Sequence, residues 1–171
     1  MLVEKGVADA AGIGMPLDSP EGQMIVNLGG DRTEISVISE GKTIIQRTLR
    51  TGGHTLDEDI MNMVKKQFQL NIGRKTAEAL KNQLAYLLNG PALEMRVFGI
   101  HTVTGLPRQV AIPALAVSVS IVDTIDAITE VVKTTMERTP PQLLENIRKN
   151  GIYLTGGVSL LPNLSIYMQK E

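Results

Sequence analysis

The sequence predicts a mixed α/β domain that carries a smaller inserted lobe. Short segments with strand patterning come first, segments with helical periodicity follow, and one short apolar segment returns near the end of the chain. The chain has 171 residues, of which 43% are hydrophobic and 20% are charged. A chain of this size buries roughly two thirds of its unfolded surface, so we expect a globular protein and not a disordered one.

The first part of the large domain is predicted as a helix end followed by an antiparallel meander. Glycine and proline between Gly12 and Pro20 stop a helix in the first 22 residues. In the second of the three strands, Ile35 and Val37 alternate with polar residues, as a strand with one buried face does. Short turns join the strands, which we place at Met24–Leu28, Thr33–Ser39 and Thr43–Leu49.

Residues 55–112 are predicted to form the inserted lobe, with two helices and a hairpin. Thr55, followed three residues later by Glu58, forms a capping box that is expected to open a helix over Asp57–Gln69. A second helix is expected to end at Asn89, and its apolar stripe consists of Leu80, Leu84, Leu87 and Leu88. The hairpin is placed at Leu93–Val103 and Arg108–Ile112.

The chain is then expected to return to the large domain with a long helix. This helix runs from about Ala114 to Met136, with an apolar stripe of Leu115, Val119, Val122, Ile125, Val132 and Met136. Pro140 and Pro141 begin a shorter helix, since proline is tolerated in a first turn. Ile152–Thr155 is expected to extend the meander as a parallel strand. A final helix follows, carrying Leu160, Leu161, Leu164 and Met168.

The composition excludes several classes of site. The chain has no cysteine, hence no disulfide and no thiolate metal site. Its two histidines, His54 and His101, do not form a ligand-spaced pair. A net charge of −1 and 3% aromatic residues argue against a nucleic-acid partner. The sequence shows no membrane segment and no signal peptide, so we expect a cytoplasmic protein.

Two glycine turns form the candidate site. Gly29–Gly30 follows the first predicted strand, and Gly156–Gly157 lies between the last strand and the last helix. Glycine lets a backbone approach a phosphate closely with its N–H groups turned outward, and a helix N-terminus adds a favourable dipole. The alternative for each turn taken separately is that it serves only to reverse the chain.

These turns and their flanks resemble the MreB family of bacterial rod-shape-determining proteins, within the actin-like ATPase superfamily. The similar stretches are MIVNLGGDRTEISVIS, TGGHTLDEDI, NIGRKTAEALK, TGLPR, TTMERTPPQLLENI and RKNGIYLTGGVSLLPNL. The resemblance implies an actin-like (ribonuclease H-like) fold that lacks the family's first domain. Residues 1–22 would be a remnant of the inter-domain helix and linker, 23–54 and 113–171 the large α/β domain, and 55–112 the small lobe.

The resemblance implies a nucleotide site whose chemistry has changed. Its nucleotide-binding positions are Gly29, Gly30, Thr33, Glu78, Lys81, Gly156 and Gly157. Lys5 occupies the position of the catalytic glutamate, with Glu4 beside it, and lysine is no general base for water. Asn27 occupies the acidic position that helps to hold the metal, and an amide lacks the anionic oxygen a hard cation prefers.

The resemblance therefore implies no catalytic residue and no metal ligand in these positions. ATP or ADP with Mg²⁺ would bind weakly or not at all, and ATP hydrolysis is not expected. For Glu78 and Lys81 the alternative is a solvent-exposed i,i+3 ion pair on a helix.

The function that the resemblance implies is that of a filament subunit or scaffold in bacterial cell-shape maintenance. Such a protein would self-associate and would contact other actin-like filament subunits or cell-shape proteins. The alternative is a working ATPase of the actin, chaperone and sugar-kinase superfamily.

Overall fold

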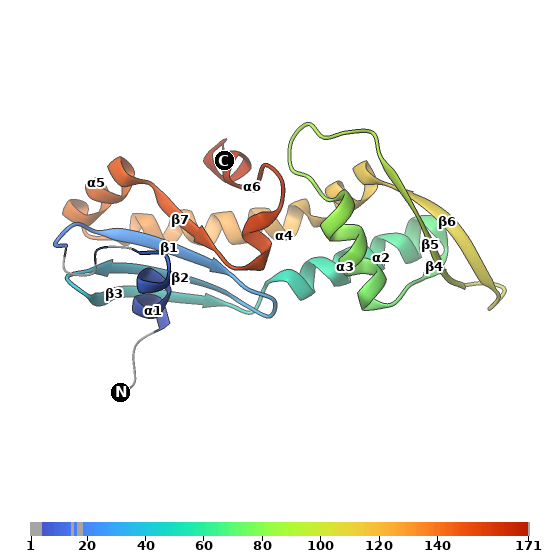
Figure 1. Cartoon of the computed structure of the whole chain (residues 1–171), viewed down its shortest axis with the longest axis horizontal. Helices are drawn as coiled ribbons and strands as arrows, with labels where there is room; N and C mark the ends of the chain where they lie inside the picture. Colours follow the sequence, from blue (N-terminus) through green and yellow to red (C-terminus); the bar gives the residue numbers. More distant parts are fainter. Residues whose placement is uncertain (1–4, 15, 17–18, 171) are drawn as a thin grey trace. The chain divides into compact units, whose positions relative to one another are not determined.

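The computed structural model describes residues 5–14, 16 and 19–170 (Figure 1). The chain folds into two compact units. Unit 1 comprises Met1–Gly53 and Ala127–Ser159, and unit 2 comprises His54–Asp126 and Leu160–Glu171. The sequence-based prediction instead assigned the whole long helix, from about Ala114 to Met136, and residues 160–171 to the large domain.

Unit 1 is built on one four-stranded sheet in the order β3-β2-β1-β7. β1 and β2 are antiparallel, as are β2 and β3, whereas β1 and β7 are parallel. The strands are β1 (Gln23–Leu28), β2 (Thr33–Ser39), β3 (Lys42–Leu49) and β7 (Ile152–Thr155). The predicted meander and its parallel extension are confirmed.

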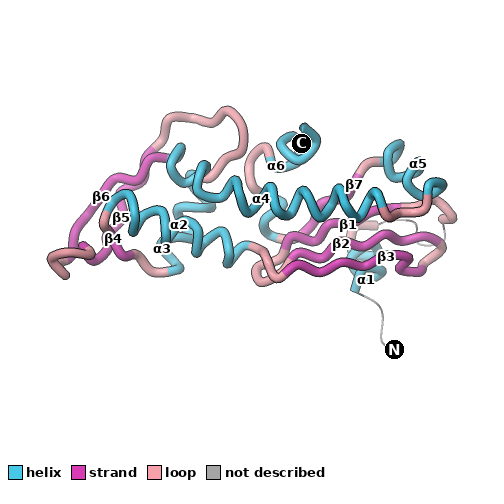
Figure 2. Tube along the Cα trace, turned by 180° about the vertical axis from the view of Figure 1, so that it is seen from behind, coloured by secondary structure: helices cyan, strands magenta, loops and turns pink. Residues whose placement is uncertain are grey.

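Helices cover both faces of this sheet. Figure 1 shows α1 (Lys5–Gly12) on one face, and Figure 2 shows the second half of α4 (Ala114–Glu137) on the other. A Cβ atom added to Gly6 of α1 would lie 2.6 Å from the Ser36 hydroxyl oxygen. The polar positions of β2 are therefore buried as well, with Glu34 only 8% exposed. Alternation in the sequence correctly separated the two faces but did not reveal that α1 covers the polar one.

Two short elements complete unit 1. α5 (Pro141–Asn150) begins after Pro140, as predicted, and ends where Gly151 adopts a φ of +84°. A Cβ atom added to Gly22, just before β1, would lie 2.6 Å from the Leu143 Cβ of α5. The short 3₁₀ helix η1 (Gly157–Leu160) follows β7.

Unit 2 contains a three-stranded antiparallel sheet in the order β4-β5-β6. It confirms the predicted hairpin and adds the two-residue strand β4, which the sequence analysis missed. The elements are α2 (Gly53–Phe68), β4 (Leu70–Asn71), α3 (Arg74–Leu84), β5 (Glu94–His101), β6 (Pro107–Pro113) and α6 (Leu164–Lys170).

Two predicted helix ends in this region are wrong. α2 begins at Gly53, so Thr55 lies within its first turn and is not the cap. α3 ends at Leu84, because Ala85 adopts an extended backbone. Leu87 and Leu88 therefore lie beyond the helix. Leu87 is nevertheless buried, and its N–H donates to the carbonyl of Pro162, which explains why it fitted an apolar stripe.

The predicted stripe of α4 is wrong in its first half. Leu115 and Val119 are 64% and 63% exposed. The buried hydrophobic residues of α4 are Ala114, Val117, Ile121, Ile125, Ile128 and Val132. Leu115 and Val119 instead line a groove of about 620 Å³ together with Met63 of α2. Similarly, Leu160 is 84% exposed and lies in η1, before the final helix. Both stripes predicted burial of residues that are exposed, because an exposed leucine and a buried leucine have the same hydrophobicity.

Candidate functional site

The two glycine turns follow the carboxyl ends of two neighbouring strands of the unit 1 sheet. β1 and β7 are parallel, and Asn27 pairs with Thr155 in register. Gly29–Gly30 and Gly156–Gly157 therefore follow neighbouring strand ends. In α/β sheets ligands bind outside the carboxyl ends of parallel strands, and this is where the sequence placed the candidate phosphate site.

The second turn requires glycine at its first position. Gly156 has a φ of +88°, and a Cβ atom there would lie 2.4 Å from the carbonyl oxygen of Leu28. The Ser159 hydroxyl donates to the carbonyl of Gly156 at 2.6 Å and closes the turn. Gly157 is exposed and a Cβ atom there would meet nothing within 4 Å. The turn thus packs directly against the end of β1 and leaves Gly157 open to a ligand.

The first turn is held from the side by the start of α2. The Gly53 N–H donates to the carbonyl of Gly29 at 2.9 Å, and the Gly29 N–H donates to the carbonyl of Arg32 at 3.0 Å. The buried Thr33 hydroxyl donates to the carbonyl of Thr51 at 2.8 Å. Thr33, one of the predicted nucleotide-binding residues, therefore holds the turn in place through its side chain.

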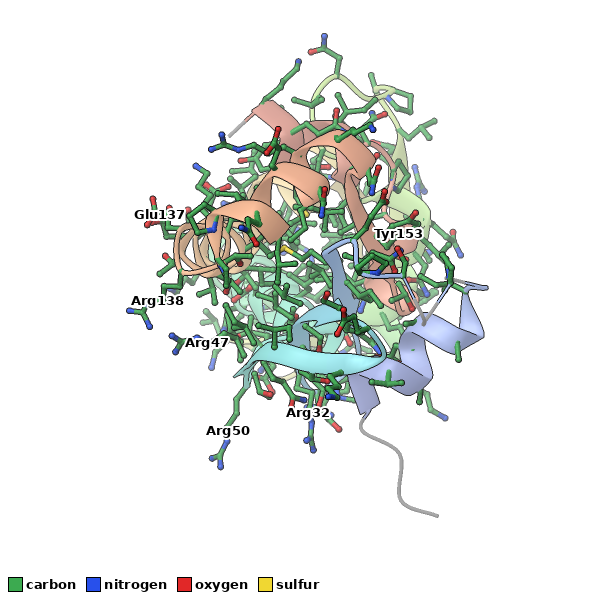
Figure 3. All side chains as sticks on the ribbon, turned by 90° about the vertical axis from the view of Figure 1, so that its left-hand side faces the viewer. Arg32, Arg47, Arg50, Glu137, Arg138 and Tyr153 are labelled. Carbon is green, nitrogen blue, oxygen red and sulfur yellow. The ribbon has the colours of Figure 1, made fainter. Side chains whose placement is uncertain are left out.

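Arg32, which follows this turn, extends away from the sheet. Its guanidinium lies 3.9 Å from the Glu34 carboxylate, and its side chain is 61% exposed. Figure 3 shows Arg32 pointing outward, as Arg47 and Arg50 do. The nearby acidic residue balances part of its charge.

Asn27, at the expected metal position, contacts a carboxylate that the sequence analysis missed. Its Nδ2 donates to Oδ2 of Asp9 in α1 at 2.8 Å. Its Oδ1 lies on the side of Gly156, 2.9 Å from where a Cβ atom on that glycine would be. Lys5 opens α1 one helical turn before Asp9, and Glu4 lies outside the described residues. The four-residue spacing between Lys5 and Asp9 places both residues on one face of a helix. This spacing was the sequence signal that could have indicated Asp9.

The two remaining predicted residues lie in unit 2, on α3. Glu78 is exposed, whereas Lys81 is only 8% exposed. The Lys81 Nζ atom lies 2.6 Å from Oδ1 of Asp57 in α2, whose side chain is 1% exposed. The alternative of a solvent-exposed pair between Glu78 and Lys81 is therefore wrong for the lysine, which forms a buried ion pair between two helices.

The described part of the chain contains no cluster of three or more His, Asp or Glu side chains that would hold a metal ion. A cation near Asp9 would thus need further oxygen ligands from water or from a bound phosphate, which is the usual way that Mg²⁺ binds. Within the same residues no helix is both long enough and apolar enough to cross a membrane.

Solved structures support the fold. The chain is similar to the crystal structure of MreB5 of Spiroplasma citri bound to AMPPNP, with a TM-score of 0.94 and 30% identity. The match covers 98% of this chain and 50% of that one. The crystal structure of the same protein bound to ADP matches with a TM-score of 0.94 over 51% of its length. The folds of units 1 and 2 therefore correspond to about half of an actin-like protein.

Sequence comparison gives the same result. The chain is 33% identical over 171 residues to the cell shape-determining protein Mbl of Bacillus subtilis. It is 32% identical to the cell shape-determining protein MreB of Escherichia coli. The chain spans about half the length of these relatives, 51% and 49% respectively. The model of the MreB/Mbl protein family matches residues 1–171, and the chain therefore belongs to that family.

Proposed function

We propose that this chain serves as a filament subunit or scaffold in bacterial cell-shape maintenance and that its unit 1 binds ATP or ADP. The observation that supports nucleotide binding is the pair of glycine turns at one sheet edge, Gly29–Gly30 and Gly156–Gly157. One relative with the same fold and 30% identity is described with AMPPNP bound and with ADP bound. The proposal assigns 23–54 and 113–171 to the family's large domain and 55–112 to its lobe.

The proposal also covers the partners. We expect self-association and contacts with other actin-like filament subunits or cell-shape proteins, in the cytoplasm. Lys5 at the position of the catalytic base removes the group that would orient an attacking water, which typically costs about 10²–10⁴-fold in rate. We therefore expect binding of nucleotide without steady turnover. Glu78, exposed on α3, stays a candidate ligand, whereas Lys81 is already paired with Asp57.

Two measurements on the full chain test the proposal. Titration with a fluorescent ADP analogue should give saturable binding. Gly156→Ala should weaken it by straining the turn, and Gly157→Ala should weaken it by placing a Cβ atom on the side left open to the ligand. Sedimentation at rising protein concentration, with electron microscopy of the pellet, should show ordered polymers. Absence of nucleotide binding would contradict the nucleotide-binding part of the proposal, and absence of polymers would contradict the filament part. Mg²⁺-dependent phosphate release by pure protein would favour the alternative of a working ATPase.

A further inference from the structure

The side chains of Asp9 and Asn27 are joined by a hydrogen bond beside the glycine turns. We call the Asp9 carboxylate and the Asn27 Oδ1 atom the oxygen set. The Asn27 Nδ2 atom donates to Asp9 Oδ2 at 2.8 Å, and both side chains are only half-buried. A carboxylate accepts hydrogen bonds only, so this contact fixes which end of the amide is the nitrogen. The Asn27 Oδ1 atom therefore faces the side of Gly156, as its 2.9 Å approach to that position shows.

This oxygen set has capacity for a further ligand. An ionised carboxylate offers about four acceptor positions, and Asn27 uses one of those on Asp9. Asp9 and Asn27 come from α1 and β1 of the same compact unit, and Gly156 follows β7 in that unit. The carboxylate and the amide oxygen are thus positioned by α1 and β1 within unit 1 and do not depend on the placement of unit 2.

Carboxylate and amide oxygens, completed by water and phosphate, are the ligands that Mg²⁺ prefers. A carboxylate beside a phosphate site repels the phosphate unless a cation lies between them. We propose that Asp9 is the carboxylate that binds the hydrated divalent cation of the bound nucleotide, with Asn27 as its positioning residue. This inference rests on the proposed nucleotide binding by unit 1, and it assigns the anionic group that Asn27 itself cannot supply.

The proposal predicts effects of opposite sign for one substitution. Asp9→Asn removes the negative charge and retains a group that can face Asn27. Without Mg²⁺ it should tighten ADP binding, because the repulsion is gone. With Mg²⁺ it should weaken ADP binding, because the cation has lost its anionic ligand. A purely structural role for Asp9 would move both affinities in the same direction.

The experiment is a titration of the full chain with a fluorescent ADP analogue, in Mg²⁺ or in EDTA. Coupling between two ligands typically spans about 5- to 150-fold. We therefore expect Mg²⁺ to lower the dissociation constant of the ADP analogue by a factor in that range, which we call the Mg²⁺ factor. Asp9→Asn should reduce this factor to below about threefold. Glu145→Gln, on an exposed position of α5 outside the site, is the control for loss of one negative charge and should leave the Mg²⁺ factor unchanged. Mn²⁺ paramagnetic resonance of the protein–ADP complex gives a second readout, because Asp9→Asn should release the bound ion.

A second variant moves the carboxylate from α1 to β1. Asp9→Ala combined with Asn27→Asp should recover a Mg²⁺ factor of at least about fivefold. This variant decides the test if Asp9→Asn does not fold, and loss of the factor in it would then overturn the proposal.

The outcomes separate the two proposals. If the wild type binds ADP but Mg²⁺ has no effect, or if Asp9→Asn keeps the Mg²⁺ factor, the role of Asp9 is overturned and nucleotide binding stands. An equal loss in Glu145→Gln overturns it as well, since the effect would then be one of general charge. If the wild type does not bind ADP under any condition, both proposals are overturned.

Discussion

Lys81 shows what a buried charge contributes to unit 2. Its ammonium and the Asp57 carboxylate are both almost fully buried and lie 2.6 Å apart. Replacing such a pair by apolar residues is often neutral, but removing one partner leaves an unpaired buried charge. We therefore expect Lys81→Met to lower the free energy of unfolding by about 3–5 kcal/mol. Urea denaturation followed by circular dichroism would measure this.

The control for Lys81 is available on the same helix. Lys75 is exposed on α3, and Lys75→Met should change stability by less than about 0.5 kcal/mol. Combining Lys81→Met with Asp57→Leu should recover much of the loss, since no unpaired charge remains. A Lys81→Met protein as stable as the wild type would show that the ion pair does not hold α2 and α3 together.

Asp59 predicts a pH dependence of stability. Burial raises the pKa of its carboxyl above the ordinary 3.8, Glu58 and Asp123 raise it further, and the hydrogen bond from Thr124 opposes them. The folded state thus binds this proton more tightly than the unfolded state. The stabilisation is fully present below the unfolded pKa and is lost as pH rises through the folded pKa.

Asp59→Asn should therefore be more stable than the wild type at pH 7, and the difference should shrink as the pH falls toward 4. Asparagine retains an oxygen that accepts from Thr124, so the variant isolates the charge. Thermal unfolding at several pH values measures this difference. Glu137→Gln, on an exposed position at the end of α4, is the control and should show no such trend.

At the scale of elements, the turn between β7 and η1 offers a matched pair of glycines. Gly156 has a φ of +88° and faces the carbonyl of Leu28, whereas an added Cβ at Gly157 meets nothing. We expect Gly156→Ala to destabilise the protein by about 1–3 kcal/mol through backbone strain, with the clash adding to it. Gly157→Ala should be close to neutral. Chemical denaturation of both variants tests this, and equal effects would contradict the described turn.

At the scale of the whole molecule, β7 leads us to expect association. Among the described residues β7 is the end strand of its sheet, and Tyr153 is 40% exposed. Edge strands recruit strands of other chains unless charge or a covering element prevents it. We predict a dimer or larger assembly at micromolar concentration, formed by strand pairing or exchange of an element. Size exclusion with light scattering would measure the mass.

The opposite edge of the same sheet provides the control. Tyr153→Lys places a charge on β7 and should shift the mass toward the monomer. Ile44→Lys makes the same change on β3, where Ile44 is 45% exposed. This end strand already carries the charged residues Lys42 and Arg47, which protect an edge from pairing, so the variant should leave the assembly unchanged. A wild-type mass that stays at 18.5 kDa at high concentration would rule out this association.

The sequence by itself determined the order and type of most elements and the two glycine turns. These features follow from local periodicity and from the backbone freedom of glycine, which act over a few neighbouring residues. Only the tertiary structure decided the partners of Lys81 and Asn27, which are separated from them by 24 and 18 residues. It also decided that Leu115 and Val119 face outward, whereas Glu34 is buried. Burial and pairing depend on which surfaces meet, and hydrophobicity along the chain does not record this.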